Sequence, residues 1–214
     1  MSPELFSQST RAERQQKPYS VVIPDTSRVD WANTISALTT QAHAKGDMLA
    51  RTPEEILELF QKKHSMVLVD EKGNLLSHAG VTFEYPDGSI EVGAVCTNEG
   101  EEGNGFGKEV VAELLTHLKQ LYPNRKIIAL ANTASEGLFK KVGGVKMSIS
   151  ELHRDVFNAC KDCLRKPAEG EKFKCCDTPY NLTNFIQKKP VMETAIFSSP
   201  AHVNGKNGAN HAKI

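Results

Sequence analysis

Three glycines in seven residues stand directly before a segment with helical periodicity: Glu102-Gly103-Asn104-Gly105-Phe106-Gly107-Lys108. The apolar face of that segment predicts a helix over 106–121. Glycine lets the main chain turn tightly and lets a ligand approach its N–H groups, and the first turn of a helix leaves such groups unpaired. The stretch therefore indicates an anion site suited to a phosphate or pyrophosphate. The alternative is a glycine-rich loop that only caps an ordinary helix.

Two other phosphate-binding motifs do not fit this stretch. A P-loop needs glycine, four residues and then Gly-Lys-Ser/Thr, and here Glu102 and Glu109 occupy the first and last of these positions. A dinucleotide fingerprint needs G-x-G-x-x-G within a βαβ unit. The spacing here is G-x-G-x-G, and antiparallel strands are expected before it, so that motif is excluded as well.

The order of expected elements points to one mixed sheet. The hairpin turn at 70–74 and the N-cap Thr52 with Pro53 after it are the strongest local features. The expected strands cover 19–23, 65–69, 75–83, 89–97, 126–131 and 145–150, and the expected helices cover 27–44, a segment from 53, 106–121 and 135–142. This order predicts an α+β fold with a mostly antiparallel sheet flanked by helices.

Composition limits the class of protein. The 214 residues are enough for one core, or for one core with a small appendage. Lysine plus arginine and aspartate plus glutamate both number 26, which weighs against bulk nucleic-acid binding. No apolar run has the length of a membrane span, and 1–16 lack the apolar stretch of a signal peptide. We therefore expect no membrane partner and a cytoplasmic protein, and the oligomeric state is left open.

The glycine stretch resembles the signature of the GCN5-related N-acetyltransferases (GNAT), Arg/Gln-x-x-Gly-x-Gly/Ala, with Glu102 in place of the first residue. Two further segments are similar to that family in the same order: 48–55 resembles the amino-acid acetyltransferase branch, and 132–144 resembles the later Asn…Gly segment. The resemblance covers about 19–150. It implies a GNAT-like domain over 18–150. From composition, we expect the polar 1–17 to be flexible, 151–197 to be a cysteine-containing appendage, and the Gly- and Asn-rich 198–214 to be a disordered tail.

The resemblance also implies an activity. It is the transfer of an acetyl group from acetyl-CoA to a primary amine of a small molecule or a protein, by direct attack in a ternary complex. Glu91 is the candidate general base, because a glutamate near an apolar strand can have a raised pKa; the alternative is an exposed carboxylate at a strand end. The residues expected to contact the coenzyme are Val95, Thr97, Gly103, Asn104, Gly105, Gly107, Lys108, Asn132 and Phe139. For Asn132 the alternative is a plain helix N-cap.

Two departures from the family favour another interpretation. Phe139 stands where the family often has a tyrosine that protonates the leaving thiolate, and phenylalanine has no proton to give. Glu99, Glu101 and Glu102 put negative charge near the expected pyrophosphate site. The alternative function is therefore a catalytically degenerate domain of GNAT fold that binds coenzyme A or acts as an interaction module.

Five cysteines suggest a second kind of site. Cys96 is expected to be a small buried core residue rather than a reactive thiol. The other four cluster late in the chain and could hold zinc: Cys160, Cys163, Cys175 and Cys176. Cys160 and Cys163 form one C-x-x-C pair, and one of the adjacent Cys175 and Cys176 together with His153 or Asp177 could complete four ligands. The alternative is a set of reduced, partly buried thiols.

Overall fold

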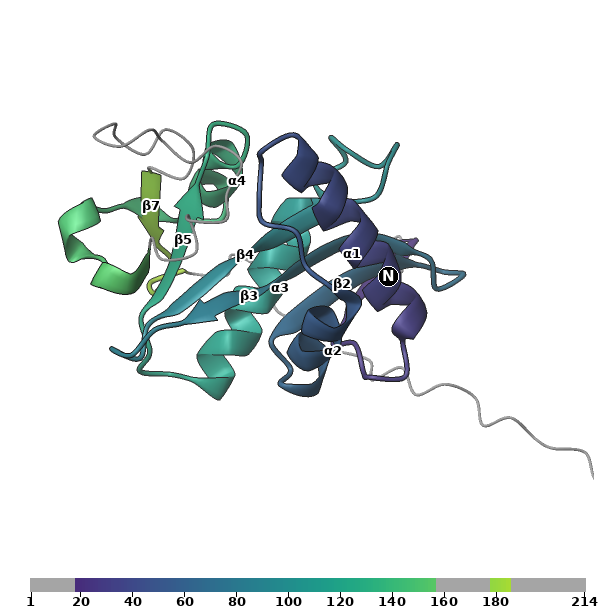
Figure 1. Cartoon of the computed structure of the whole chain (residues 1–214), viewed down its shortest axis with the longest axis horizontal. Helices are drawn as coiled ribbons and strands as arrows, with labels where there is room; N and C mark the ends of the chain where they lie inside the picture. The colour runs from purple at the N-terminus through teal and green to yellow at the C-terminus, as the bar shows by residue number, and fades with distance from the viewer. Residues whose placement is uncertain (1–17, 157–177, 186–214) are drawn as a thin grey trace, which may run out of the picture.

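The computed structural model describes residues 18–156 and 178–185. Within these residues seven strands form one sheet in the order β1-β2-β3-β4-β5-β7-β6, in which β4 and β5 run parallel and the other neighbours run antiparallel (Figure 1). The strands are β1 (Tyr19–Val22), β2 (Ser65–Asp70), β3 (Leu75–Glu84), β4 (Ile90–Thr97), β5 (Ile127–Ala131), β6 (Val145–Lys146) and β7 (Thr178–Asn181). The expected α+β class with a mostly antiparallel sheet is confirmed.

The helices cover both faces of this sheet. They are α1 (Val29–Ala44), α2 (Pro53–Gln61), α3 (Phe106–Leu121) and α4 (Glu136–Lys141), and a short 3-10 helix η1 covers Ile149–Glu151. Successive side chains of a strand point to opposite faces. Met66 and Leu68 of β2 accordingly pack with α3, whereas Val67 and Val69 pack with α1 and α2. The two helix layers therefore lie on opposite faces of the sheet (Figure 1).

The start of α2 confirms the helix signal read from the sequence. Thr52 is the N-cap, and its hydroxyl accepts the Glu55 N–H at 3.3 Å while the Glu55 carboxylate accepts the Thr52 N–H at 2.8 Å. Pro53 occupies the first turn. This reciprocal pair satisfies two N–H groups that the helix itself leaves without partners, and it fixes where the preceding loop enters the helix.

The C-terminal side of the sheet differs from expectation. β6 has only two residues rather than the expected six, because the chain turns into η1 at Ile149. β7 lies between β5 and β6, and its Tyr180 is almost fully buried in the core, where its ring stacks on Phe139 of α4. The expected boundary at residue 150 therefore does not separate β7 from the sheet. Within the described ranges, no helix is both long and apolar enough to cross a membrane.

Candidate active site

The parallel neighbours β4 and β5 separate soon after they start. They pair at Ile90 with Ile127 and at Glu91 with Ile128, and no further pairs follow among the described residues. The pairing of β3 with β4 also shifts in this region, where Ala94 adopts a left-handed conformation with φ of 47°. An extra residue in one strand of a pair bends that strand. The bend and the separation together open the sheet next to the end of β4.

A cleft of about 1160 Å³ occupies this opening. Four parts of the chain line it: the second half of β4, the glycine turn before α3, the α1–α2 loop, and the β5–α4 segment. Of the expected coenzyme contacts, eight line the cleft: Val95, Thr97, Gly103, Gly105, Gly107, Lys108, Asn132 and Phe139. Asn104 does not, because its side-chain amide instead donates to the Glu101 carboxylate at 3.1 Å.

The glycine turn holds a conformation that side chains disfavour. Gly103 and Gly105 have φ of +84° and +83°, and Gly105 is the N-cap of α3 with no side-chain cap. The turn also packs closely on β4, since a Cβ added at Gly107 would lie 3.6 Å from Val95 Cγ1. The N-terminal N–H groups of α3 receive no capping side chain and border the cleft, which is the arrangement an anionic group requires.

The acidic side chains near this turn are partly engaged by the turn itself. The Glu102 carboxylate accepts the Gly100 N–H at 2.8 Å, and the Glu101 carboxylate accepts the Asn104 amide. Both residues still border the cleft. Hydrogen bonds do not remove their charge, so a bound pyrophosphate would meet some repulsion there. Solvent screens this repulsion in part, because Glu102 is exposed and Glu101 is half-buried.

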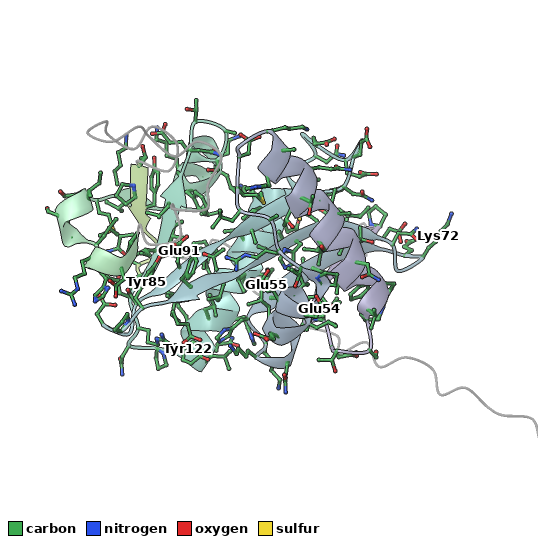
Figure 2. The ribbon with its side chains drawn as sticks, viewed as in Figure 1. Glu54, Glu55, Lys72, Tyr85, Glu91 and Tyr122 are labelled. Carbon is green, nitrogen blue, oxygen red and sulfur yellow. The ribbon has the colours of Figure 1, made fainter. Side chains whose placement is uncertain are left out.

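Glu91 is a buried carboxyl group in the wall of the cleft, and its side chain lies near that of Tyr85 (Figure 2). The Thr82 hydroxyl donates to Oε1 at 2.9 Å, and the Tyr85 hydroxyl donates to Oε2. Burial raises the pKa of Glu91 above its ordinary value, and the bonds from Tyr85 and Thr82 offset only part of that effect. The alternative of an exposed carboxylate at a strand end is therefore wrong. A carboxyl with a raised pKa is suited to accept a proton near neutral pH.

Arg51 is a cleft residue that sequence reasoning did not select as a site residue. Its guanidinium lies 5.4 Å from the centroid of the Phe83 ring, and its polar contacts are long, 3.4 Å to the Thr82 carbonyl and 3.5 Å to Glu55. It also lowers the pKa of Glu91 by its charge. The sequence could have indicated its position. Arg51 directly precedes Thr52, the N-cap of α2, so it had to lie at the end of the α1–α2 loop.

Asn132 connects two walls of the cleft. Its side-chain amide donates to the Asp47 carbonyl in the α1–α2 loop at 2.9 Å, and its Oδ1 accepts the Ser135 N–H at 2.9 Å. The N-cap of α4 is Ser135, but the bond from the Ser135 N–H to Asn132 Oδ1 is itself a capping bond for the turn that leads into α4. Asn132 therefore caps that turn and also reaches across the cleft. The side chain thus holds the loop before α2 against the segment before α4.

Phe139 contributes a hydrocarbon surface to the cleft. Its side chain is 2% exposed, and its ring stacks on Tyr180 with 6.2 Å between centroids. The Tyr180 hydroxyl points elsewhere, since it donates to Glu136 at 3.2 Å. The Tyr180 hydroxyl therefore does not take the place of the missing tyrosine oxygen at position 139.

The expected zinc ligands Cys160, Cys163, Cys175 and Cys176, together with Asp177, lie outside the described residues. Within the described part of the chain, no group of three or more His, Cys, Asp or Glu side chains is arranged to hold a metal ion. Cys96 is buried, and burial raises the pKa of its thiol to about 12. That environment confirms the expectation of an unreactive core residue.

The chain has the fold of solved acetyltransferases, one of which is an acetyltransferase of the GNAT family from Staphylococcus aureus, with a TM-score of 0.53 at 10% identity, covering 77% of this chain and 99% of that one. The fold that the resemblance implied is thereby confirmed. Within that class, residues 71–154 match the model of the FR47-like protein family. Comparison with curated proteins gives no significant sequence match.

Solved structures with the same fold contain coenzyme A. The chain is similar to N-acetylglutamate synthase from Neisseria gonorrhoeae complexed with coenzyme A and N-acetyl-glutamate, with a TM-score of 0.58, 16% identity, and coverage of 77% of this chain and 35% of that one. It thus spans about a third of that synthase.

Two further structures span most of their own chains. A putative acetyltransferase from Salmonella typhimurium with its cofactor acetyl-CoA gives a TM-score of 0.52 at 14% identity, covering 77% of this chain and 91% of that one. A protein from Mycobacterium tuberculosis in complex with coenzyme A gives 0.51 at 19% identity, covering 67% and 82%. At these identities the likeness establishes the fold.

Proposed function

We propose that this protein transfers an acetyl group from acetyl-CoA to a primary amine by direct attack in a ternary complex. The observation that carries the proposal is a single cleft bordered by three features: the glycine turn at the start of α3, the bent β4, and the buried carboxyl of Glu91. An anion site, an open strand edge and a poised base are the parts that acetyl transfer from a thioester needs.

The residues present fit a coenzyme A molecule. The N–H groups at the start of α3, with Gly103, Gly105 and Gly107 leaving room for close approach, would hold the pyrophosphate, and Lys108 would add a positive charge. Main-chain groups of Val95 and Thr97 would contact the pantetheine arm, because β5 does not pair with that part of β4. When bound, acetyl-CoA supplies the activated acyl group.

Glu91 would prepare the acceptor. An amine arrives largely as an ammonium ion, and it loses one proton to the Glu91 carboxylate before its lone pair can attack. The nitrogen then bonds to the thioester carbon, the carbonyl oxygen gains negative charge, and a main-chain N–H of β4 stabilises that charge. The nitrogen is positively charged after the attack and gives up a second proton to solvent. When the C–S bond breaks, its electron pair leaves with sulfur, a neutral amide remains, and Glu91 returns its proton to solvent.

The departing thiolate would take its proton from solvent. Phe139 borders the cleft but has no proton to donate. Coenzyme A thiolate is a fair leaving group, so the reaction does not depend on a protein acid. The absence of a hydroxyl at position 139 would lower the rate without preventing turnover.

Arg51 favours an acceptor that carries a negative charge near its amine. Its guanidinium borders the cleft with long contacts to its present partners, so donors remain for a carboxylate. The Neisseria gonorrhoeae synthase was solved with N-acetyl-glutamate, an acetylated amino acid. We therefore propose an amino acid as the first candidate acceptor and a protein amine as the second.

Two linked measurements test the proposal on the full chain. Acetyl-CoA should raise the melting temperature in a saturable way, and thiol release should follow when an amine panel of amino acids, simple amines and a lysine peptide is added. An unchanged melting temperature at millimolar acetyl-CoA would reject both the binding of the coenzyme and the proposed enzymatic activity. A variant with Gly107→Ala is the matched control, because the added methyl meets only ordinary contacts in the free protein but lies where the pyrophosphate is expected.

A second candidate is a domain that binds coenzyme A without turnover. Phe139 and the acidic side chains of Glu101 and Glu102 beside the anion site favour it. A saturable melting shift with no thiol release across the whole panel, and no acetylated product by mass spectrometry, would select this candidate over the enzyme.

A further inference from the structure

His78 on β3 is a fully buried histidine with two defined partners. Its Nδ1 lies 2.9 Å from the Ala94 carbonyl oxygen, and its Nε2 lies 2.6 Å from the Ser65 hydroxyl. A carbonyl oxygen only accepts hydrogen bonds, so Nδ1 carries the hydrogen and Nε2 accepts from Ser65. Burial lowers the pKa of His78 to about 4. The ring is therefore neutral at pH 7 and held in a single tautomer.

The partner of His78 is the residue at the bend of β4. Ala94 has φ of 47°, a left-handed conformation that a residue with a Cβ disfavours. Such a conformation persists only where the surrounding structure holds it. The pairing of β3 with β4 shifts between His78 and Gly80, opposite Cys96 and Gly93. The imidazole thus binds main-chain oxygen at the place where the regular strand pairing is interrupted.

Peptide geometry carries the effect of this bond into the cleft. The Ala94 carbonyl and the Val95 N–H belong to one planar trans peptide unit, in which the two groups point in opposite directions. With the carbonyl directed at His78, the N–H of Val95 is directed away from His78, and Val95 borders the cleft. A hydrogen bond to the carbonyl also polarises the unit and makes its N–H a stronger donor.

We propose that His78 is a positioning residue, which holds the Ala94–Val95 peptide so that the Val95 N–H is presented to the carbonyl oxygen of a bound thioester. The proposal rests on the proposed function, since it needs acetyl-CoA in the cleft. Position 80 supports it, because a Cβ there would lie 3.2 Å from His78 Cε1. The glycine leaves the room that the imidazole needs to reach the bend.

Two amide substitutions separate the hydrogen bond from the ring. In His78→Asn the side-chain NH₂ group sits the same number of bonds from Cβ as Nδ1, so the donor to Ala94 is retained. In His78→Gln the amide lies one carbon further out, so that donor is lost. Both variants are uncharged and both remove ring volume. A difference between them therefore reports the bond to Ala94 and not the loss of packing.

Paired binding measurements read out the Val95 N–H without needing an acceptor. Coenzyme A lacks the thioester carbonyl and acetyl-CoA has it. One net hydrogen bond corresponds to about fivefold in affinity. By calorimetry, the wild type and His78→Asn should bind acetyl-CoA about fivefold more tightly than coenzyme A. His78→Gln should bind the two with about equal affinity, and the affinity for coenzyme A should be the same in all three proteins.

Ser65→Ala provides a second variant should His78→Gln fail to fold. It removes the hydroxyl that fixes the tautomer. The ratio of the affinity for acetyl-CoA to that for coenzyme A should then lie between the wild-type ratio and a ratio of one, which means no preference. His64→Gln is the control for a buried histidine elsewhere, because His64 is 3% exposed and bonds Tyr122 at 2.8 Å, away from the bend. That variant should keep the full preference.

The outcomes that overturn the proposal are distinct from failure of the proposed function. If His78→Asn and His78→Gln show the same preference for acetyl-CoA over coenzyme A, or lose affinity for coenzyme A in parallel, the role of His78 is structural only. A wild type that binds coenzyme A and acetyl-CoA equally would reject the role of the Val95 N–H and leave the coenzyme site standing. A wild type that binds neither would reject the proposed function, and this proposal with it.

Discussion

Replacing Glu91 with glutamine separates the chemistry of this carboxyl group from its place in the fold. The side chain is buried, and it accepts hydrogen bonds from Thr82 and Tyr85. Glutamine has the same shape, and the Tyr85 hydroxyl can rotate to accept from the new NH₂ group. The substitution therefore preserves the packing and removes the ability to take a proton.

The effect on stability has a definite sign. Burial raises the pKa of Glu91 in the folded chain above the value of 4.5 that it has when exposed. The folded state then holds a proton that the unfolded state releases, so this group's contribution to stability falls as pH rises from 4.5 through the folded pKa. Glutamine has no such penalty. Glu91→Gln should unfold at the same or a higher urea concentration than the wild type at pH 7.

The effect on turnover should be large. General base catalysis contributes about 10²- to 10⁴-fold, so kcat for amine acetylation should fall by about that factor while the affinity for acetyl-CoA changes little. The rising limb of the pH profile of kcat/KM should disappear in the variant. Thiol release, calorimetry and urea unfolding at pH 7 measure the three quantities.

A matched substitution guards the interpretation. Glu84 lies on the neighbouring strand β3, and its carboxylate pairs with Arg125 at 2.6 Å outside the cleft. The variant Glu84→Gln removes this carboxylate, and its kcat should stay near that of the wild type. Unchanged kcat in Glu91→Gln, or a loss of kcat explained by a matching loss of stability, would refute the role of Glu91 as the base.

Four further predictions follow from individual contacts. Gly107→Ala should fold at least as stably as the wild type, because the added methyl meets Val95 and Thr97 at ordinary distances and alanine favours helices; its affinity for acetyl-CoA by calorimetry should nevertheless fall by more than about tenfold, and unchanged affinity would remove the pyrophosphate from the glycine turn. Phe139→Tyr should raise kcat by up to about tenfold by giving the thiolate a proton donor; a lower kcat at equal coenzyme affinity would contradict that reasoning. The pKa of His78 is about 4 when folded against an ordinary 6.5, so its contribution to stability should be lost as pH falls from 6.5 to 4, by about 3 kcal/mol in total; urea midpoints that vary with pH in parallel for the wild type and His78→Gln would exclude this. Thr52→Ala should lower the free energy of unfolding by about 1 kcal/mol, and an unchanged urea midpoint would show that the capping box does not stabilise α2.

Local chemistry in the sequence was enough to predict the central elements. The N-cap Thr52 and the apolar periodicity of 106–121 depend on neighbours within a few residues, and the structure has both α2 and α3 there. β7 could not be predicted in this way. Thr178–Asn181 is four residues long and contains a proline, and its place is set by pairing with β5, about fifty residues earlier in the chain.

The candidate site was predictable in part for the same reason. Glycines at 103–107 mark a turn whatever surrounds them, and the structure has that turn at the cleft. The bend at Ala94 leaves no mark in the sequence, because alanine does not favour a positive φ and the bend depends on contacts such as that with His78 on β3. The hydrogen bonds that tie Asn132 to the α1–α2 loop also join segments far apart in the chain.

The most direct test of acetyl transfer at this cleft is a calorimetric titration of the full chain with acetyl-CoA. Mass spectrometry of an amino-acid acceptor incubated with the same complex follows it. We expect one saturable site of micromolar affinity and an acceptor heavier by one acetyl group, with one free thiol released for each acetyl group transferred. A titration without heat or melting shift up to millimolar acetyl-CoA would contradict it.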